Sequence, residues 1–182
     1  LFIIPHSYFL YVGRIEAKKN LHVIIDAFQK LRRAKKIPDD MQLILVGRRG
    51  YQSEATLKAA QEKGGGTIRY LSWVPSATLQ ELYRGATAFL FPSLYEGFGF
   101  PVLEALSYGV PVIASDIPAL REIGGSAPTF VSPTVDSFRE AMAAIASRTP
   151  TERERAQWKT HTAQFSWETA AKKTLTVLGN AL

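Results

Sequence analysis

Short runs of apolar residues alternate along the chain with longer amphipathic segments, and this alternation is the feature that most restricts the fold. Continuous runs rich in Val, Ile and Phe are typical of strands buried on both faces of a parallel sheet whose connections are helices. We expect strands near residues 8–13, 42–46, 67–72, 87–92, 111–115 and 127–131. We expect helices near residues 19–36, 52–63, 76–84, 100–108, 118–124, 135–147, 152–163 and 167–179. The pattern predicts an α/β fold with a six-stranded, mainly parallel sheet.

The chain has 182 residues, a length that suits one domain with a self-sufficient core. In the first expected helix Leu21, Ile24 and Phe28 recur at three- and four-residue steps, which places them on one face toward the sheet. Ser166 precedes the last expected helix and is a candidate N-cap. No repeat or low-complexity linker divides the sequence, so we expect one continuous domain over residues 1–182.

Two carboxylates flank a glycine-rich turn in the middle of the chain. Glu96 precedes the run Gly97-Phe98-Gly99-Phe100-Pro101, and Glu104 follows in the helix that the turn opens. Exposed backbone N–H groups and the positive end of the helix dipole favour an anion, and Pro101 suits a first helical position. Carboxylates accept hydrogen bonds from the hydroxyls of a ribose or hexose. The segment therefore indicates a nucleotide-sugar site, with the diphosphate at the turn.

Five motifs in register give the chain a resemblance to the C-terminal, donor-binding half of the retaining GT-B glycosyltransferases of family 4. They are Tyr11-Val12-Gly13-Arg14 with Lys19-Asn20, Leu45-Val46-Gly47, Trp73-Val74-Pro75, the segment from Glu96 to Asp116, and Phe165-Ser166-Trp167. The resemblance covers nearly the whole chain and implies a Rossmann-like, three-layer α/β/α architecture. It also implies that an N-terminal acceptor-binding domain is missing, and that residues 165–182 form a helix that crosses back to that domain and is poorly supported without it.

Two basic residues follow the first expected strand. Arg14 offers a planar fork of donors and Lys19 a flexible point charge, and both suit the two phosphates of a nucleotide-sugar. The resemblance implies that they neutralise the leaving nucleoside diphosphate without a metal, so we expect neither a metal nor another cofactor. The alternative is a surface Arg and Lys beside Glu16.

The resemblance gives the two carboxylates different roles. Glu104 matches the residue that accepts hydrogen bonds from the ribose hydroxyls. The alternative is that Glu104 is a residue near the helix N-terminus that only interacts with the helix dipole. Glu96 matches the carboxylate near the donor sugar and is our candidate catalytic residue. It would either hold sugar hydroxyls or stabilise oxocarbenium character, and the alternative is a solvated turn residue.

The remaining donor-binding candidates act through their backbone. Phe98, Gly99 and Phe100 are expected to present N–H groups to the phosphates or the sugar, while their rings either pack in the core or line the cleft. Gly97 and Gly99 are expected to allow a positive φ or a close approach of the ligand. Gly13 lies in the loop after the first strand, and the main chain of Val74 resembles a position that reads the nucleobase edge. Trp73 beside it is expected to do no more than cap the core.

Charge and composition narrow the class of function. The formal net charge is +6, and we interpret its densest cluster, at residues 32–36, as a solvated helix end in preference to a partner surface. There is no cysteine, which excludes disulfides and thiolate nucleophiles, and we expect a cytoplasmic protein without a nucleic-acid partner. In the full enzyme, peripheral contact with an anionic membrane face is expected. The sequence has no G-x-G-x-x-G or Walker loop, which argues against an NAD enzyme or a P-loop NTPase.

We therefore expect a donor-binding domain that transfers a hexosyl group, with retention, from a UDP- or GDP-linked sugar to a glycan, a lipid-linked acceptor or a small molecule. The first methionine is Met41, so we expect the chain to be part of a longer protein and inactive by itself. Two alternatives stay open, namely half of a nucleotide-sugar epimerase and a non-catalytic module that binds a nucleotide-sugar or a polyanion.

Overall fold

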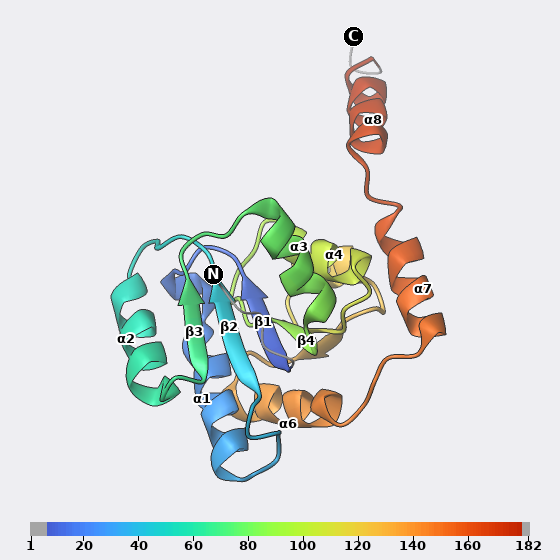
Figure 1. Ribbon diagram of the computed structural model, residues 1–182. Helices are drawn as coiled ribbons and strands as arrows, with labels where there is room; N and C mark the ends of the chain where they lie inside the picture. The colour runs from blue at the N-terminus through green and yellow to red at the C-terminus, as the bar shows by residue number, and fades with distance from the viewer. Residues whose placement is uncertain (1–6, 180–182) are drawn as a thin grey trace.

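A single six-stranded sheet organises the computed structural model, which describes residues 7–179 (Figure 1). All five pairs of neighbouring strands are parallel, and the strand order is β3-β2-β1-β4-β5-β6. The strands are β1 (Tyr8–Val12), β2 (Gln42–Val46), β3 (Ile68–Leu71), β4 (Ala88–Phe91), β5 (Val112–Ser115) and β6 (Thr129–Val131). The predicted α/β fold with its parallel sheet is confirmed.

Helices cover both faces of the sheet. They are α1 (Leu21–Arg33), α2 (Ser53–Gly64), α3 (Ser76–Gly85), α4 (Phe100–Ser107), α5 (Pro118–Gly124), α6 (Val135–Ala146), α7 (Glu152–Thr162) and α8 (Trp167–Gly179). Helix α1 packs against α2 and α6, whereas α4 packs against α5 and α7, which gives three layers. The predicted helices are all present, and their bounds shift by at most three residues because the helix termini are set by local caps.

The core lies where the apolar runs of the strands meet the apolar stripes of the helices. Every residue of β4 and β5 is buried, as expected for central strands of a sheet covered on both faces. The apolar stripe of α1 is buried as predicted, and the ring of Phe28 meets that of Phe9 edge to face with centroids 6.4 Å apart. The same periodicity that predicted the elements therefore builds the core.

The strand order reverses between β1 and β4. Strand β1 lies in the middle of the sheet, β2 and β3 follow on one side of it, and the chain then crosses over and continues with β4, β5 and β6 on the other side. The loops that follow β1 and β4 therefore leave the carboxyl edge of the sheet side by side and diverge. In open α/β sheets such a reversal opens a crevice that binds ligands.

The pairing of β1 with β2 continues past the ends of the strands. Beyond Val12 and Val46 the loops stay parallel, with Ile15 N–H donating to the carbonyl of Arg48 at 2.9 Å and a bridge between Ile15 and Arg49. Gly47 makes this close approach possible, because a Cβ atom there would lie 1.9 Å from the carbonyl oxygen of Gly13. The loop that carries the expected phosphate ligands is thus hydrogen-bonded along its backbone to the loop after β2.

Helix α8 projects from the body of the molecule as a separate arm (Figure 1). None of its residues is buried, and Leu175, Val177 and Leu178 are exposed. Ser166 caps it as predicted, since its Oγ accepts the N–H of Thr169 at 3.1 Å. The expectation that this segment is poorly supported stays a prediction, and residues 180–182 of the expected crossover helix lie outside the described residues.

Replacing Gly47 with Ala should destabilise the domain. Gly47 has φ +149° and has the backbone of Gly13 in the space that a methyl group would fill, so the free energy of unfolding should fall by about 2 kcal/mol or more. Urea unfolding followed by circular dichroism measures the change. Gly97→Ala is the matched control, because a methyl group on Gly97 would have no neighbour within 4 Å, and equal losses for both variants would contradict the prediction.

Candidate functional site

An ion pair at the reversal of the sheet forms the centre of the candidate site. The Nζ atom of Lys19, in the loop after β1, lies 2.6 Å from Oε1 of Glu96, in the loop after β4. The side chains are 12% and 10% exposed, so most of the pair is shielded from water. Lys19 also lies over the ring of Phe91, 5.5 Å from its centroid. The sequence predicted both residues as site residues but not their contact.

Local backbone structure holds Lys19 in this place. Lys19 ends a short 3-10 helix, η1 (Ala17–Lys19), and the buried Asn20 then adopts a left-handed conformation with φ 57° before α1 begins. Asn is one of the few side chains that tolerate this conformation. Its Nδ2 donates to the carbonyl of Pro133, and Leu94 N–H donates to the carbonyl of Lys18 at 2.9 Å. The second of these bonds ties the β1 loop to the β4 loop and brings the pair together.

The glycine-rich turn supplies unpaired backbone donors, as predicted. Within residues 7–179 the N–H groups of Gly97, Phe98, Gly99 and Phe100 have no acceptor, because they precede or open α4. Gly99 has φ 109°, and a Cβ atom there would lie 2.5 Å from Leu120. Gly97 does not have a positive φ, so that part of the prediction is wrong. A Cβ atom on Gly97 would have no neighbour within 4 Å, so the space that a close approach of a ligand needs is open. The turn can therefore bind an anion through its backbone.

Glu104 has a protein partner on one of its two carboxylate oxygens. The hydroxyl of Tyr83, in α3, donates to Oε2 of Glu104 at 2.8 Å. Burial, followed by the charge of Glu104, raises the pKa of Tyr83 well above its ordinary value, so this hydroxyl stays a donor. The second oxygen, Oε1, has no partner among the described residues. The carboxylate is thus held on one side and open on the other.

A continuous row of aromatic rings lies beneath these charged groups. Tyr11 stacks with Phe91, Phe91 with Phe89, Phe89 contacts Tyr83, and Tyr83 stacks with Tyr108, with centroids between 5.4 and 6.1 Å apart. All but Tyr108 are buried. We call these five residues the aromatic row.

Three of the four predicted charged residues, Arg14, Lys19 and Glu104, contact a member of the row. The hydroxyl of Tyr11 donates to the carbonyl of Arg14 at 3.0 Å. Phe91 lies under Lys19, and Tyr83 holds Glu104. The sequence did not identify these aromatic residues as part of the site. Their only signal was tyrosine in otherwise apolar segments, where a buried hydroxyl needs a partner.

Arg14 lies at the open rim of the site. It is exposed, and over residues 7–179 its guanidinium has no hydrogen-bond or ion-pair partner. Its aliphatic stem lies beside Gly50, where a Cβ atom would be 2.6 Å from the Cδ atom of Arg14. Glu16, the alternative partner, has its carboxylate 3.5 Å from Lys18 instead. Arg14 therefore keeps all of its donors available.

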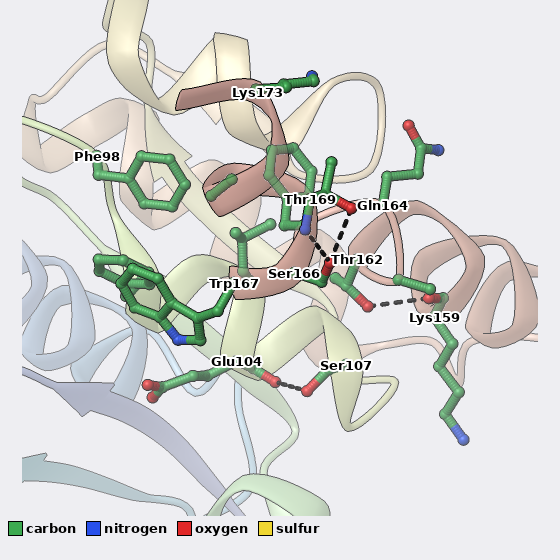
Figure 2. Close-up of a pocket in the computed structure, with 15 residues that line it drawn as sticks. Phe98, Glu104, Ser107, Lys159, Thr162, Gln164, Ser166, Trp167, Thr169 and Lys173 are labelled. Carbon is green, nitrogen blue, oxygen red and sulfur yellow. Dashed lines mark hydrogen bonds between the residues drawn. The ribbon is translucent and has the colours of Figure 1, made fainter. Parts of the chain in front are cut away.

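A pocket of about 1080 Å³, whose lining includes Glu104, opens between α4 and the junction of α7 with α8 (Figure 2). Four aromatic side chains in its lining contact one another. The ring centroid of Phe98 lies 4.5 Å from that of Phe100 and 6.3 Å from that of Phe165, and the ring of Phe100 stacks with that of Trp167. Phe98 and Phe100 are 37% and 51% exposed, so the alternative that their rings belong to the core is wrong. Their aromatic neighbours Phe165 and Trp167 are exposed as well, so the rings are not enclosed.

The segment after β3 contributes least to the observed site. Val74 is partly buried against the core, as a residue that acts through its backbone can be. Trp73 is 66% exposed, so the expectation that it caps the core is wrong. Trp73 lies in the loop between β3 and α3, where its ring is left in solvent.

The described part of the chain has no side-chain cluster of the kind that binds metals. Residues 7–179 contain no group of three or more His, Cys, Asp or Glu side chains that could hold a metal ion. No helix in the same range combines the length and the apolar character needed to cross a membrane. The expected independence from metals stays a prediction.

The chain matches a family model and curated proteins of one kind. The model described as "Glycosyl transferases group 1" matches residues 5–164. The O-antigen chain mannosyltransferase B of Escherichia coli is 36% identical over 173 residues, which are 93% of this chain and 45% of that protein. The glycogen synthase of Mycobacterium tuberculosis (strain ATCC 25618 / H37Rv) is 31% identical over 173 residues, 92% of this chain and 41% of that protein. The chain thus spans less than half the length of these relatives.

Solved structures share the fold. A sucrose-phosphate synthase from Thermosynechococcus elongatus superposes with a TM-score of 0.78 at 23% identity, over 97% of this chain and 45% of its own. The apo form of the lipopolysaccharide outer core galactosyltransferase WaaB superposes with a TM-score of 0.73 at 24% identity. The superposition covers 98% of this chain and 50% of the WaaB chain. At these identities the likeness establishes the fold, and it confirms the predicted Rossmann-like architecture.

The Lys19–Glu96 pair should show a measurable coupling energy. Removing either partner leaves a shielded charge uncompensated, so the losses of stability in Lys19→Met and Glu96→Gln should add up to more than the loss in the double variant. We expect a coupling of about 1–3 kcal/mol from urea unfolding of the four proteins.

The pair between Lys18 and Glu16 in the same loop is the matched control for this cycle. Its atoms are 3.5 Å apart and Lys18 is 53% exposed, so its coupling should stay below about 0.5 kcal/mol. Equal coupling for the two pairs would show that the shielding of Lys19 and Glu96 has no energetic effect.

Proposed function

The chain belongs to the family of glycosyl transferases group 1, and from this premise we propose that it is the donor-binding half of a retaining, two-domain GT-B glycosyltransferase of family 4. The reaction moves a hexosyl group from a nucleoside-diphosphate sugar to an acceptor that the other half of the enzyme holds. Several of the relatives are mannosyltransferases, so a mannosyl donor is the first to test.

The observation that carries this proposal is the Lys19–Glu96 pair beside four unpaired N–H groups at the reversal of the sheet. A cation, a carboxylate and a row of backbone donors lie together at the edge where α/β sheets bind ligands. A nucleotide-sugar offers matching chemistry, since it carries an anionic diphosphate next to a polyhydroxylated ring. This match connects the family to a specific place on the molecule.

The diphosphate is the part of the donor that the basic groups bind. The N–H groups at the start of α4 and the dipole of that helix favour an anion, and Lys19 and Arg14 add two positive charges. When the glycosidic bond to phosphate breaks, the bonding electrons leave with the nucleoside diphosphate. The same positive groups then stabilise the additional charge on the leaving group, and no metal is required for that step.

Glu96 acts at the sugar end of the donor. In the free domain its carboxylate balances Lys19, and a diphosphate that binds Lys19 provides the competing negative charge. Glu96 then either accepts hydrogen bonds from sugar hydroxyls or stabilises the oxocarbenium character of the anomeric carbon. Glu104 accepts hydrogen bonds from the ribose hydroxyls through the oxygen that Tyr83 leaves open. Retention of configuration follows from the family 4 assignment.

The partner of this domain is an acceptor-binding half, which would place a glycan, a lipid-linked acceptor or a small molecule against the donor. We propose that the full enzyme works in the cytoplasm, with peripheral contact to the anionic face of a membrane when the acceptor is lipid-linked. The epimerase and binding-module alternatives have no observation in the structure that favours them.

Arg14→Ala and Lys19→Ala should weaken the binding of nucleoside diphosphate far more than the binding of the free nucleoside. Each variant removes a charge-assisted contact worth about 1.5–3 kcal/mol, which corresponds to roughly ten- to more than a hundredfold in affinity. Calorimetry with UDP, GDP and their nucleosides measures the difference.

Arg33→Ala is the control for this experiment, because it removes the same charge from the far end of α1. Equal losses for nucleotide and nucleoside would mean that Arg14 and Lys19 maintain the fold. EDTA should leave the affinity of the wild type unchanged, and a large effect of EDTA would contradict the metal-free diphosphate site.

Transfer should require both halves of the enzyme. The isolated chain should bind the donor without transferring sugar, because orientation of the acceptor and exclusion of water need the closing partner domain. Adding the acceptor-binding half of the full protein should restore transfer with the α-configuration retained, and Glu96→Gln should abolish transfer while the bare diphosphate still binds. NMR of the product identifies the anomer, and an inverted product or free epimerised sugar would refute the proposal.

A further inference from the structure

Tyr83 is a buried residue that ends in the candidate site. Its ring is 2% exposed, and its hydroxyl reaches Oε2 of Glu104 across the interface of α3 and α4 at 2.8 Å. Neither the family resemblance nor the sequence pattern gave this residue a role. The buried hydroxyl needs a partner, and the partner it has is one oxygen of an exposed carboxylate to which the resemblance gives a role in ligand binding.

The orientation of the Tyr83 ring is fixed by its neighbours in the aromatic row. Tyr108 stacks on one side, with centroids 5.4 Å apart and planes 10° apart, and Phe89 contacts it at 5.7 Å. Arg84 lies over the ring of Tyr108, 5.3 Å from its centroid. The hydroxyl therefore points in one direction, and it restricts a glutamate side chain that would otherwise sample several rotamers.

We propose that Tyr83 is a positioning residue that presents the free oxygen of Glu104 to the hydroxyls of a ribose. The proposal deepens the donor-binding function and rests on it. Tyr83 itself does not touch the nucleotide. Its hydroxyl occupies one carboxylate oxygen, so the other is held in a defined place where it can accept hydrogen bonds from the sugar. Because the Glu104 side chain is already ordered, less conformational entropy is lost when the nucleotide binds.

The chain contains a matched tyrosine that lacks this role. Tyr8 is also fully buried and also donates its hydroxyl at 2.8 Å, but to the backbone carbonyl of Leu82. Tyr8 begins β1, so its bond lies toward the edge of the sheet opposite the candidate site. Replacing either tyrosine with phenylalanine deletes one buried hydroxyl, and only Tyr83 is linked to Glu104.

The experiment compares ribonucleotide with 2′-deoxyribonucleotide binding by calorimetry. The probe is whichever of UDP and GDP binds the wild type more tightly, together with its 2′-deoxy counterpart. The proteins are wild type, Glu104→Gln, Tyr83→Phe, the double variant of these two, and Tyr8→Phe, each shown to be folded by circular dichroism. The quantity measured is the ratio of the two affinities, which a general loss of stability does not change.

Tyr83→Phe should reduce the preference for ribose about two- to tenfold, through weaker binding of the ribonucleotide, while the deoxy form stays within about twofold of wild type. Glu104→Gln should reduce the preference at least as much, and the double variant should add nothing further, because Tyr83 acts through Glu104. Tyr8→Phe should keep the wild-type ratio. If Tyr83→Phe cannot be recovered in a folded state, Tyr108→Leu, which removes the stacked ring at a partly buried position, should lower the ratio in the same direction.

The outcomes separate the two levels of the proposal. If wild type prefers ribose and Glu104→Gln loses that preference while Tyr83→Phe keeps it, the positioning role is overturned and the donor site stands. If Tyr83→Phe and Glu104→Gln lower the ratio independently, Tyr83 acts without Glu104 and the positioning role is again overturned. If wild type binds both nucleotides equally, the ribose contact of Glu104 is wrong, and the role of Tyr83 is overturned with it.

Discussion

The structure depends on one topological constraint, the pairing of β1 with β4. Because the first strand lies in the middle of a parallel sheet, the chain must build outward in one direction, return and build outward in the other. The loops after β1 and β4 separate at that point and leave an edge lined by residues far apart in sequence. Lys19 and Glu96 are 77 positions apart and meet there, with their side chains shielded by the two loops. The ion pair, the free N–H groups of the α4 turn and the exposed Arg14 are consequences of this single crossing.

The aromatic row supports the charged groups that gather where the chain crosses from one side of the sheet to the other. Charged groups at the edge of a sheet would move freely if only solvent surrounded them, and here their supports are buried rings. Tyr11 holds the backbone at Arg14, Phe91 underlies Lys19, and Tyr83 holds Glu104. The rings contact one another in sequence, so a displacement at one end changes the packing at the next. Apolar packing and polar function thus share the same side chains.

The fold, and the placement of several candidate site residues at one edge of the sheet, could be predicted from the sequence, because local patterns determine both. The continuous apolar runs identified all six strands, and the position of motifs after strands placed Lys19 and Glu96 at the same edge. The Lys19–Glu96 contact and the Tyr83–Glu104 bond could not be predicted. They join segments that only tertiary packing brings together, and such contacts produce no recognisable spacing in the sequence. The exposed rings of Phe98, Phe100 and Trp73 were misjudged or left open for a related reason. Hydrophobicity predicts burial only where other elements are available to cover the side chain.

The Lys19–Glu96 pair also affects how salt influences ligand binding. A lysine exposed to solvent attracts small anions, and an incoming phosphate must displace them, so affinity falls steeply as ionic strength rises. Lys19 already has a counter-charge that is covalently part of the chain. In the proposed donor complex, a phosphate that binds Lys19 would displace Glu96 and would release no anion from this lysine to the bulk solvent. We therefore expect electrolyte concentration to influence attraction at the rim, where Arg14 is exposed, more than the contact at the centre.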